Sequence, residues 1–122
     1  MNLFLPLHYI SPLKILIMQI EFMEDYLLEL YEQGKTKNKK HRFQPQVIRK
    51  YKQKIDILKA VSRVEDLFVM NSMNYEVITN SNGRQSVRVD GKFRIEFYTS
   101  TEGQEPDAIT ICSITKLSNH YQ

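Results

Sequence analysis

The chain has 122 residues, of which 42% are apolar and 25% are charged, and its formal net charge at pH 7 is +3. This length predicts one domain with a single modest core, and the low Gly and Pro content is ordinary for a soluble protein. The only cysteine, Cys112, excludes an internal disulfide and fits a reducing compartment.

Residues 1–17 are apolar but do not have the pattern of a membrane span or a secretory signal. Pro6 and Pro12 interrupt them, no basic region precedes them and no small-residue cleavage site follows. A span needs about 20 unbroken apolar residues. We interpret residues 1–17 as an N-terminal appendage, outside a domain that covers 18–122. An amphipathic lid or a membrane-surface segment is the alternative.

The sequence of the first half of the domain predicts one strand followed by helices. Alternating apolar and polar side chains favour a strand at 18–23, and apolar residues at helical spacing favour helices at 24–33 and 45–60. Gly34 is typical of the end of a helix. The pattern S-R-V-E matches a capping box and predicts a short helix over 62–68.

The second half predicts strands. Residues 74–79 are expected as a strand, 80–83 as a turn, 85–98 as a hairpin, 100–107 as a loop and 108–117 as the last strand. This order predicts an α+β fold with an N-terminal strand, two to three helices and then an antiparallel meander. The helices are expected on one face of the sheet, and the other face can stay open to solvent.

The hairpin is the most informative stretch, because apolar residues alternate on both sides of an Asp-Gly turn. The five apolar residues are Val87, Val89, Phe93, Ile95 and Phe97. They share one face only if Val89 pairs with Phe93, which leaves 90–92 as the loop. This register places Arg88 opposite Arg94, and Ser86 opposite Glu96, on the other face. A two-residue loop would mix both faces.

Charge is unevenly distributed along the chain. Residues 18–34 contain five acids and no base, whereas residues 35–59 contain ten Lys and Arg and one acid. A basic block beside an acidic block indicates either a polyanionic partner or pairing within the molecule.

The two hairpin arginines are candidates for binding phosphate. A guanidinium group donates paired hydrogen bonds to phosphate and stays charged at neutral pH. The alternative interpretation of Arg88 and Arg94 is a cross-strand charge set with Glu96, or a solvated surface.

His120 is the candidate for proton transfer, because an imidazole titrates near neutral pH. It lies two residues from the C-terminus, so a solvated tail is the alternative. Tyr121 or Glu96 is a possible second proton-transfer group.

The basic loop contains Lys37, Lys39, Lys40 and Arg42, and it is either an arm for a phosphate backbone or a solvated loop. The chain has no nucleotide-binding loop, no Cys/His metal pattern and no nucleophile elbow. Any catalysis is therefore expected to need no metal and no cofactor.

The segment S-V-R-V-D-G-K-F-R-I-E-F, the ending S-N-H-Y and the helix start F-Q-P-Q-V-I resemble the HigB-like branch of the RelE/ParE toxin superfamily. The resemblance covers about 18–122. It implies a RelE-like fold, similar to microbial ribonucleases, and a small cytoplasmic bacterial toxin of a type II toxin–antitoxin pair. Such toxins cut mRNA in the ribosomal decoding site. A cognate antitoxin, often with a helix-turn-helix domain, silences them, so a monomer or an antitoxin-bound complex is expected, without a membrane.

The resemblance also implies roles for single residues. Arg94 matches the family arginine at the scissile phosphate, and Arg88 matches the arginine six residues earlier. His120 matches the C-terminal histidine of the family, and Tyr121 takes the place of a neighbouring tyrosine.

One family feature is missing. Many relatives have a lysine on the strand before the hairpin, where this chain reads Y-E-V-I-T with Thr79 near that position. Arg84 or Lys92 could replace it, and together with the basic loop they are the expected RNA-binding residues. The resemblance leaves two other functions open: a toxin of the same fold that inhibits DNA gyrase, and an inactive relative that only binds antitoxin.

Overall fold

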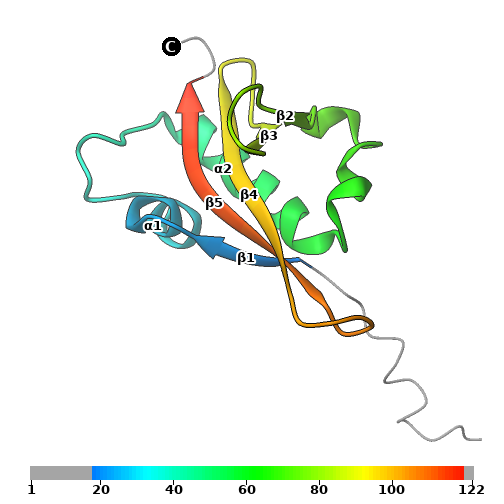
Figure 1. The fold of residues 1–122 in the computed structure, drawn as a ribbon. Coiled ribbons are helices and arrows are strands. Elements are labelled where there is room, and N and C mark those ends of the chain that lie inside the picture. Colours follow the sequence, from blue (N-terminus) through cyan, green and yellow to red (C-terminus); the bar gives the residue numbers. More distant parts are fainter. Residues whose placement is uncertain (1–17, 120–122) are drawn as a thin grey trace, which may run out of the picture.

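The computed structural model describes residues 18–119, and within them two α-helices lie beside a five-stranded sheet (Figure 1). In chain order the main elements are β1 (Gln19–Phe22), α1 (Asp25–Gln33), α2 (Pro45–Ala60), β2 (Glu76–Val77), β3 (Gln85–Arg88), β4 (Phe93–Glu102) and β5 (Ile109–Asn119). Two short 3-10 helices, Val64–Leu67 and Asn71–Met73, lie between α2 and β2. The predicted α+β class is confirmed.

The sheet is mixed, with the strand order β1-β5-β4-β3-β2. β1 runs parallel to β5, with Gln19 opposite Ile111, and the other neighbouring pairs are antiparallel. The sequence pattern did not indicate the parallel pair, because its two strands come from opposite ends of the domain. This pairing places β1 at one edge of the sheet and the short β2 at the other.

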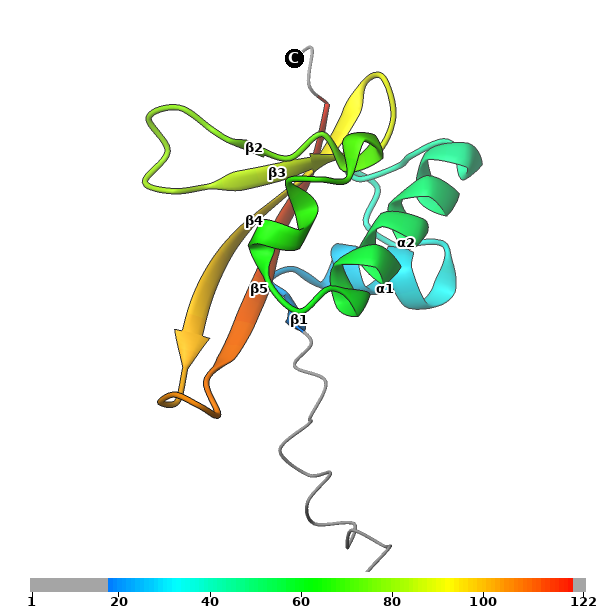
Figure 2. The same cartoon turned by 90° about the vertical axis from the view of Figure 1, so that its right-hand side faces the viewer.

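The two predicted helices are confirmed, and both lie on the same face of the sheet (Figure 2). α1 ends at Gly34, whose φ of 74° is in the left-handed region that glycine adopts easily. α2 begins at Pro45, where the missing N–H leaves no hydrogen bond unmade. Each helix buries one apolar stripe, with Leu27 and Leu30 from α1 and Ile55 among those from α2.

Three local predictions were wrong. The residues that match a capping box do not cap a helix, since Arg63 precedes the 3-10 turn and the side chain of Asp66 instead accepts a hydrogen bond from the backbone N–H of Ser62. The expected strand at 74–79 is reduced to β2. The loop expected at 100–107 is shorter, because β4 and β5 stay paired as far as Glu102 opposite Ile109.

One buried hydrogen bond joins the two helices through the core. The Tyr51 hydroxyl donates to the backbone carbonyl of Leu27 over 2.7 Å, and both side chains are fully buried. Burial raises the pKa of Tyr51, so the hydroxyl keeps the proton it donates.

Replacing Tyr51 by Phe should lower the free energy of unfolding by about 1–2 kcal/mol, because the Leu27 carbonyl loses its side-chain donor inside the core. Urea denaturation measures the change. Tyr31→Phe is the matched control, since its hydroxyl bonds to Asp56 at an exposed site and its loss should cost less than about 0.5 kcal/mol. Equal losses would show that the buried bond contributes nothing specific.

The thiol of Cys112 should be inert in the folded protein. Its side chain is fully buried, and burial raises its pKa to about 12, so little thiolate forms at neutral pH. A colorimetric disulfide reagent should therefore label no thiol in native buffer and one thiol per chain in denaturant. Rapid labelling of the native protein would contradict the position of β5 in the core.

Candidate functional site

The β3–β4 hairpin has the register that the apolar pattern predicts. Arg88 lies opposite Arg94, and the backbone N–H of Val89 donates to the carbonyl of Phe93 over 2.9 Å. The Asp90 carboxylate closes the loop, because its Oδ1 accepts from the backbone N–H groups of both Lys92 and Phe93 at 2.8 Å. The loop is therefore fixed by an aspartate side chain.

This register separates the two faces of β4. Ile95 and Phe97 are fully buried in the core under the helices, whereas Arg94 and Glu96 belong to the opposite face. On the neighbouring strand, Ser118 lies opposite Arg94. We call this side of the sheet the open face.

A β-bulge lies at the same point. The pairing of β4 with β5 shifts between Glu96 and Phe97, so that Lys116 opposes Glu96 and Ile114 opposes Phe97. Thr115 is the extra residue, and its hydroxyl donates to the Glu96 carbonyl over 3.1 Å. Bulges of this kind re-aim side chains and are frequent beside functional sites. Here the bulge keeps Lys116 on the open face and Ile114 in the core.

The open face contains a pocket of about 340 Å³, lined by residues 76–79 and by Ser86, Arg94, Glu96, Lys116, Ser118 and Asn119. It brings two cations and two carboxylates, those of Glu76 and Glu96, into one concave surface. This pocket, which we call the Arg94 pocket, is the candidate site.

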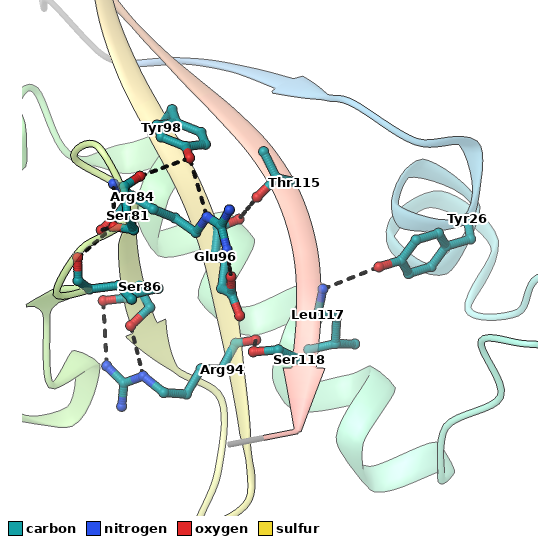
Figure 3. A network of polar contacts seen from close by, with 11 residues as sticks. Tyr26, Ser81, Arg84, Ser86, Arg94, Glu96, Tyr98, Thr115, Leu117 and Ser118 are labelled. Carbon is teal, nitrogen blue, oxygen red and sulfur yellow. Dashed lines mark hydrogen bonds and ion pairs between the residues drawn. The ribbon is translucent and has the colours of Figure 1, made fainter. Parts of the chain in front are cut away.

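Arg94 is buried, with 6% of its surface exposed, and is held by several polar groups. Its Nε donates to the Ser86 hydroxyl over 2.8 Å, and its Nη2 donates to the Asn74 carbonyl (Figure 3 shows the Ser86 contact). Nη2 also lies 3.8 Å from Oε2 of Glu76. The sequence predicted an open guanidinium here. The backbone that leads into β2 instead covers the guanidinium. The Asn74 carbonyl in this segment is one of the nearby acceptors that a buried charge needs.

One edge of Arg94 still reaches the pocket. Nη1 takes part in none of these bonds within residues 18–119, and Arg94 is one of the residues that line the pocket. Burial lowers the pKa of Arg94, the charge of Arg88 lowers it further, and the nearby carboxylates of Glu76 and Glu96 oppose that shift. A guanidinium remains charged under such conditions. Arg94 can therefore bind an anion with one fixed donor edge.

Lys116 is the residue that sequence reasoning missed. It lines the pocket directly across from Glu96, and within residues 18–119 its ammonium makes no hydrogen bond or ion pair. The alternation around Leu117 does place Lys116 on the face opposite the core. Only the pairing with β4, set by the bulge, puts it beside Arg94 and Glu96. Lys116 is thus a cation available to a ligand in the pocket.

Arg84, one of the expected RNA-binding residues, is bonded to the wall of the pocket (Figure 3). Its Nη1 lies 3.1 Å from Oε1 of Glu96, and its Nε donates to the Tyr98 hydroxyl over 3.3 Å. The hydrogen bonds to Tyr98 and Glu96 raise the pKa of Arg84. The guanidinium is therefore already engaged by its neighbours.

Arg88 is exposed but is not one of the pocket residues. Its Nε donates back to the Asp90 carbonyl over 3.2 Å. Burial lowers the pKa of Lys54 on α2, and the charges of Arg88 and Lys50 lower it further, so Arg88 lies within electrostatic reach of Lys54. The predicted pair is thus adjacent in register, and Arg94 lines the pocket whereas Arg88 does not.

The other expected RNA-binding residues lie outside the Arg94 pocket. Lys37, Lys39, Lys40, Arg42 and Lys92 are all exposed on loops. The loop between α1 and α2, which carries the first four, ends near the β3–β4 hairpin, where Phe43 packs edge-on against Phe93 at 5.6 Å between ring centroids. Within residues 18–119 the ion pairs are Arg63–Asp66, Arg84–Glu96 and Arg94–Glu76, so none of them joins the basic block 35–59 to the acidic block 18–34. The hydrogen bond to Tyr31 raises the pKa of Lys59, and the charge of Glu32 in the acidic block contributes to that shift.

His120 and Tyr121 lie outside the described residues, and so do residues 1–17. Asn119, which precedes His120 in the sequence, lines the Arg94 pocket. Thr79, at the place of the missing family lysine, lines it as well.

Two other hollows have larger volumes than the Arg94 pocket. One of about 440 Å³ lies against α2 and contains Arg49, Lys52 and Asp56. The other, about 530 Å³, contains Gln85, whose amide is already bonded to Tyr75 and Thr99. In the first hollow, Arg49 and Lys52 lie beside Asp56, but none of these side chains is buried, whereas the Arg94 pocket contains a buried guanidinium that hydrogen bonds hold in place, so the Arg94 pocket is the better candidate.

In residues 18–119 no helix is long and apolar enough to cross a membrane, and no three His, Cys, Asp or Glu side chains gather closely enough to hold a metal ion. Comparison with protein-family models gives no match, and neither do comparisons with curated proteins and with solved structures.

Replacing Arg94 by Ala should lower the free energy of unfolding by about 1–3 kcal/mol, because Ser86, the Asn74 carbonyl and Glu76 lose a shared buried donor. Arg88→Ala is the matched control. Its exposed side chain makes one local bond, and its loss should change stability by less than about 0.5 kcal/mol. If thermal or urea unfolding is equally sensitive to both, the Arg94 contacts are not structural.

Proposed function

We propose that this protein is a metal-independent endoribonuclease, the toxin of a type II toxin–antitoxin pair with a RelE-like fold, and that it cuts mRNA on the ribosome. The single observation that carries the proposal is the Arg94 pocket. It combines an aimed guanidinium, an unpaired ammonium and a carboxylate on the open face of a small sheet. The resemblance of the hairpin and the C-terminal residues to HigB-like toxins gives this pocket its substrate.

Cleavage without a metal uses the 2′-hydroxyl of the substrate as the nucleophile. Its oxygen forms a bond to phosphorus while the bond from phosphorus to the 5′-oxygen breaks, which leaves a 2′,3′-cyclic phosphate and a 5′-hydroxyl. The reaction needs cations for the charge that grows on the phosphoryl oxygens, and a base and an acid for two protons. Arg94 and Lys116 are proposed as the cations, and His120 as the acid.

Lys116 is proposed to supply the ammonium that the family pattern places on the strand before the hairpin. It lies on the last strand instead, opposite Glu96. The exposed basic loop and Lys92 are proposed to add attraction for the RNA backbone, with a strong dependence on salt. The proposed setting is the bacterial cytoplasm, with a cognate antitoxin, often a helix-turn-helix protein, as the second partner.

One observation favours a second candidate. Because Arg94 is largely buried in a hydrogen-bonded network, its role can be structural alone, and the protein is then a non-catalytic toxin of the same fold or an inactive antitoxin-binding relative. DNA gyrase inhibition with intact mRNA would support the first of these, and absence of toxicity on strong expression would support the second.

The test is cleavage of a translated mRNA by the purified chain, followed by analysis of the RNA ends. Cuts that require ribosomes and leave a cyclic phosphate and a 5′-hydroxyl are expected. His120→Ala and Lys116→Met should each slow cleavage about 10²- to 10³-fold, because one removes the acid and the other a charge-stabilising donor. Arg63→Met, outside the pocket and outside the basic block 35–59, is the control and should cut like the parent. A parent chain that leaves mRNA intact would overturn the proposal.

A further inference from the structure

Arg84 and Tyr98 lie beside the pocket as a bonded pair, and Glu96 is the pocket residue that they contact. We infer that Arg84 is a positioning residue, which with Tyr98 fixes the Glu96 carboxylate as the base that accepts the 2′-hydroxyl proton. This inference rests on the proposed function and deepens it by assigning the second proton-transfer group.

The guanidinium of Arg84 is held by more than Glu96. Its Cζ lies 5.7 Å from the centroid of the Tyr98 ring, and the Tyr98 hydroxyl donates to the Ser81 carbonyl over 3.2 Å. The backbone N–H of Arg84 donates to the Ser81 hydroxyl over 3.1 Å. Both ends of the arginine are therefore tied to the same turn (Figure 3).

That turn, residues 80–83, is a tightly specified piece of backbone. Asn80 and Asn82 both have φ of 58°, and Gly83 has φ of 88°, which are left-handed conformations that these residue types tolerate best. The Ser81 hydroxyl also donates to the Ile78 carbonyl. Because the turn is specified in this way, the backbone of Arg84 has a defined position, and its side chain reaches β4 from there.

Only one oxygen of Glu96 is used by this arrangement. Oε1 contacts Arg84, whereas Oε2 makes no bond to any residue in 18–119 and is not a buried atom without a partner. The Glu96 side chain is 13% exposed and lines the Arg94 pocket, so Oε2 is the oxygen that a ligand can reach. Arg94 and Lys116 flank it on the same face.

The proton balance of the step is complete. Oε2 takes the proton of the 2′-hydroxyl as that oxygen bonds to phosphorus, and the departing 5′-oxygen takes a proton from the acid, proposed as the His120 imidazolium. Glu96 ends neutral and the imidazole ends neutral, and exchange with water restores both. Arg84 does not touch the RNA in this scheme.

The first experiment separates chemistry from binding at Glu96. Glu96→Gln keeps an oxygen for Arg84 but cannot accept the proton, so kcat should fall about 10²- to 10³-fold while KM changes less than about twofold. Added formate should restore part of the rate of Glu96→Ala, because a small carboxylate can replace a missing base. Glu96→Gln that cuts at the parent rate would overturn the inference.

The second experiment tests whether Arg84 acts through Glu96. Arg84→Met should lower kcat about tenfold with KM unchanged, and should add no further loss in the Glu96→Gln background. Arg84→Lys keeps the charge but cannot reach both partners, so it should recover only part of the rate. Arg63→Met, which removes an exposed guanidinium elsewhere, is the control and should cut like the parent.

Two outcomes contradict the positioning role. Additive losses in the double variant, with a raised KM and a weaker salt dependence for Arg84→Met, would make Arg84 a direct ligand of RNA. Arg84→Met and Arg84→Lys that both cut at the parent rate would make the contact dispensable. If the parent chain does not cut RNA at all, the proposed function fails first, which distinguishes that failure from a cutting parent whose Glu96 and Arg84 variants are unimpaired.

Discussion

The register of the β3–β4 hairpin is the constraint on which the rest of the structure depends. Because side chains alternate along a strand, one register sends Ile95 and Phe97 under the helices and sends Arg94 and Glu96 to the open face. A slip of one residue would move a guanidinium into the apolar core and expose two of its largest side chains. The core and the pocket are thus two consequences of one pairing, and the burial of the first enforces the geometry of the second.

The sequence predicted the parts of the fold that local patterns determine. The hairpin register followed from five alternating apolar residues, and both helices followed from apolar stripes with Gly34 and Pro45 at their ends. The site could be predicted only in part. Arg94 was assigned correctly to the open face, but its burial depends on the Asn74 carbonyl, which lies 20 residues earlier in the chain. No local pattern reports which backbone will cover a side chain.

The sequence did not reveal the place of Lys116 or the partners of Arg84, and both omissions have the same physical cause. Lys116 enters the pocket because β5 pairs with β4 through a bulge, and Arg84 contacts the pocket wall because Glu96 and Tyr98 bind its guanidinium. A bulge reverses the face of every residue beyond it, so alternation read along β5 alone could not relate Lys116 to Arg94. An arginine's partner across two strands depends on rotamers and distances that composition does not contain. Contacts between strands, rather than the elements themselves, were the missing information.

Burial of Arg94 has an energetic consequence for its role. Moving a guanidinium out of water carries a desolvation cost of several kcal/mol, and acceptors such as Ser86 and Glu76 offset that cost without making the arrangement more stable than an apolar one. The acceptors instead fix the orientation of Arg94, since they bind Nε and Nη2 and leave Nη1 without a partner in residues 18–119. The Arg84–Glu96 contact has the same form, with Oε1 held and Oε2 left accessible. Two charged groups that line one pocket, each with one polar atom that has no partner in residues 18–119, are better explained by a ligand between them than by stability alone.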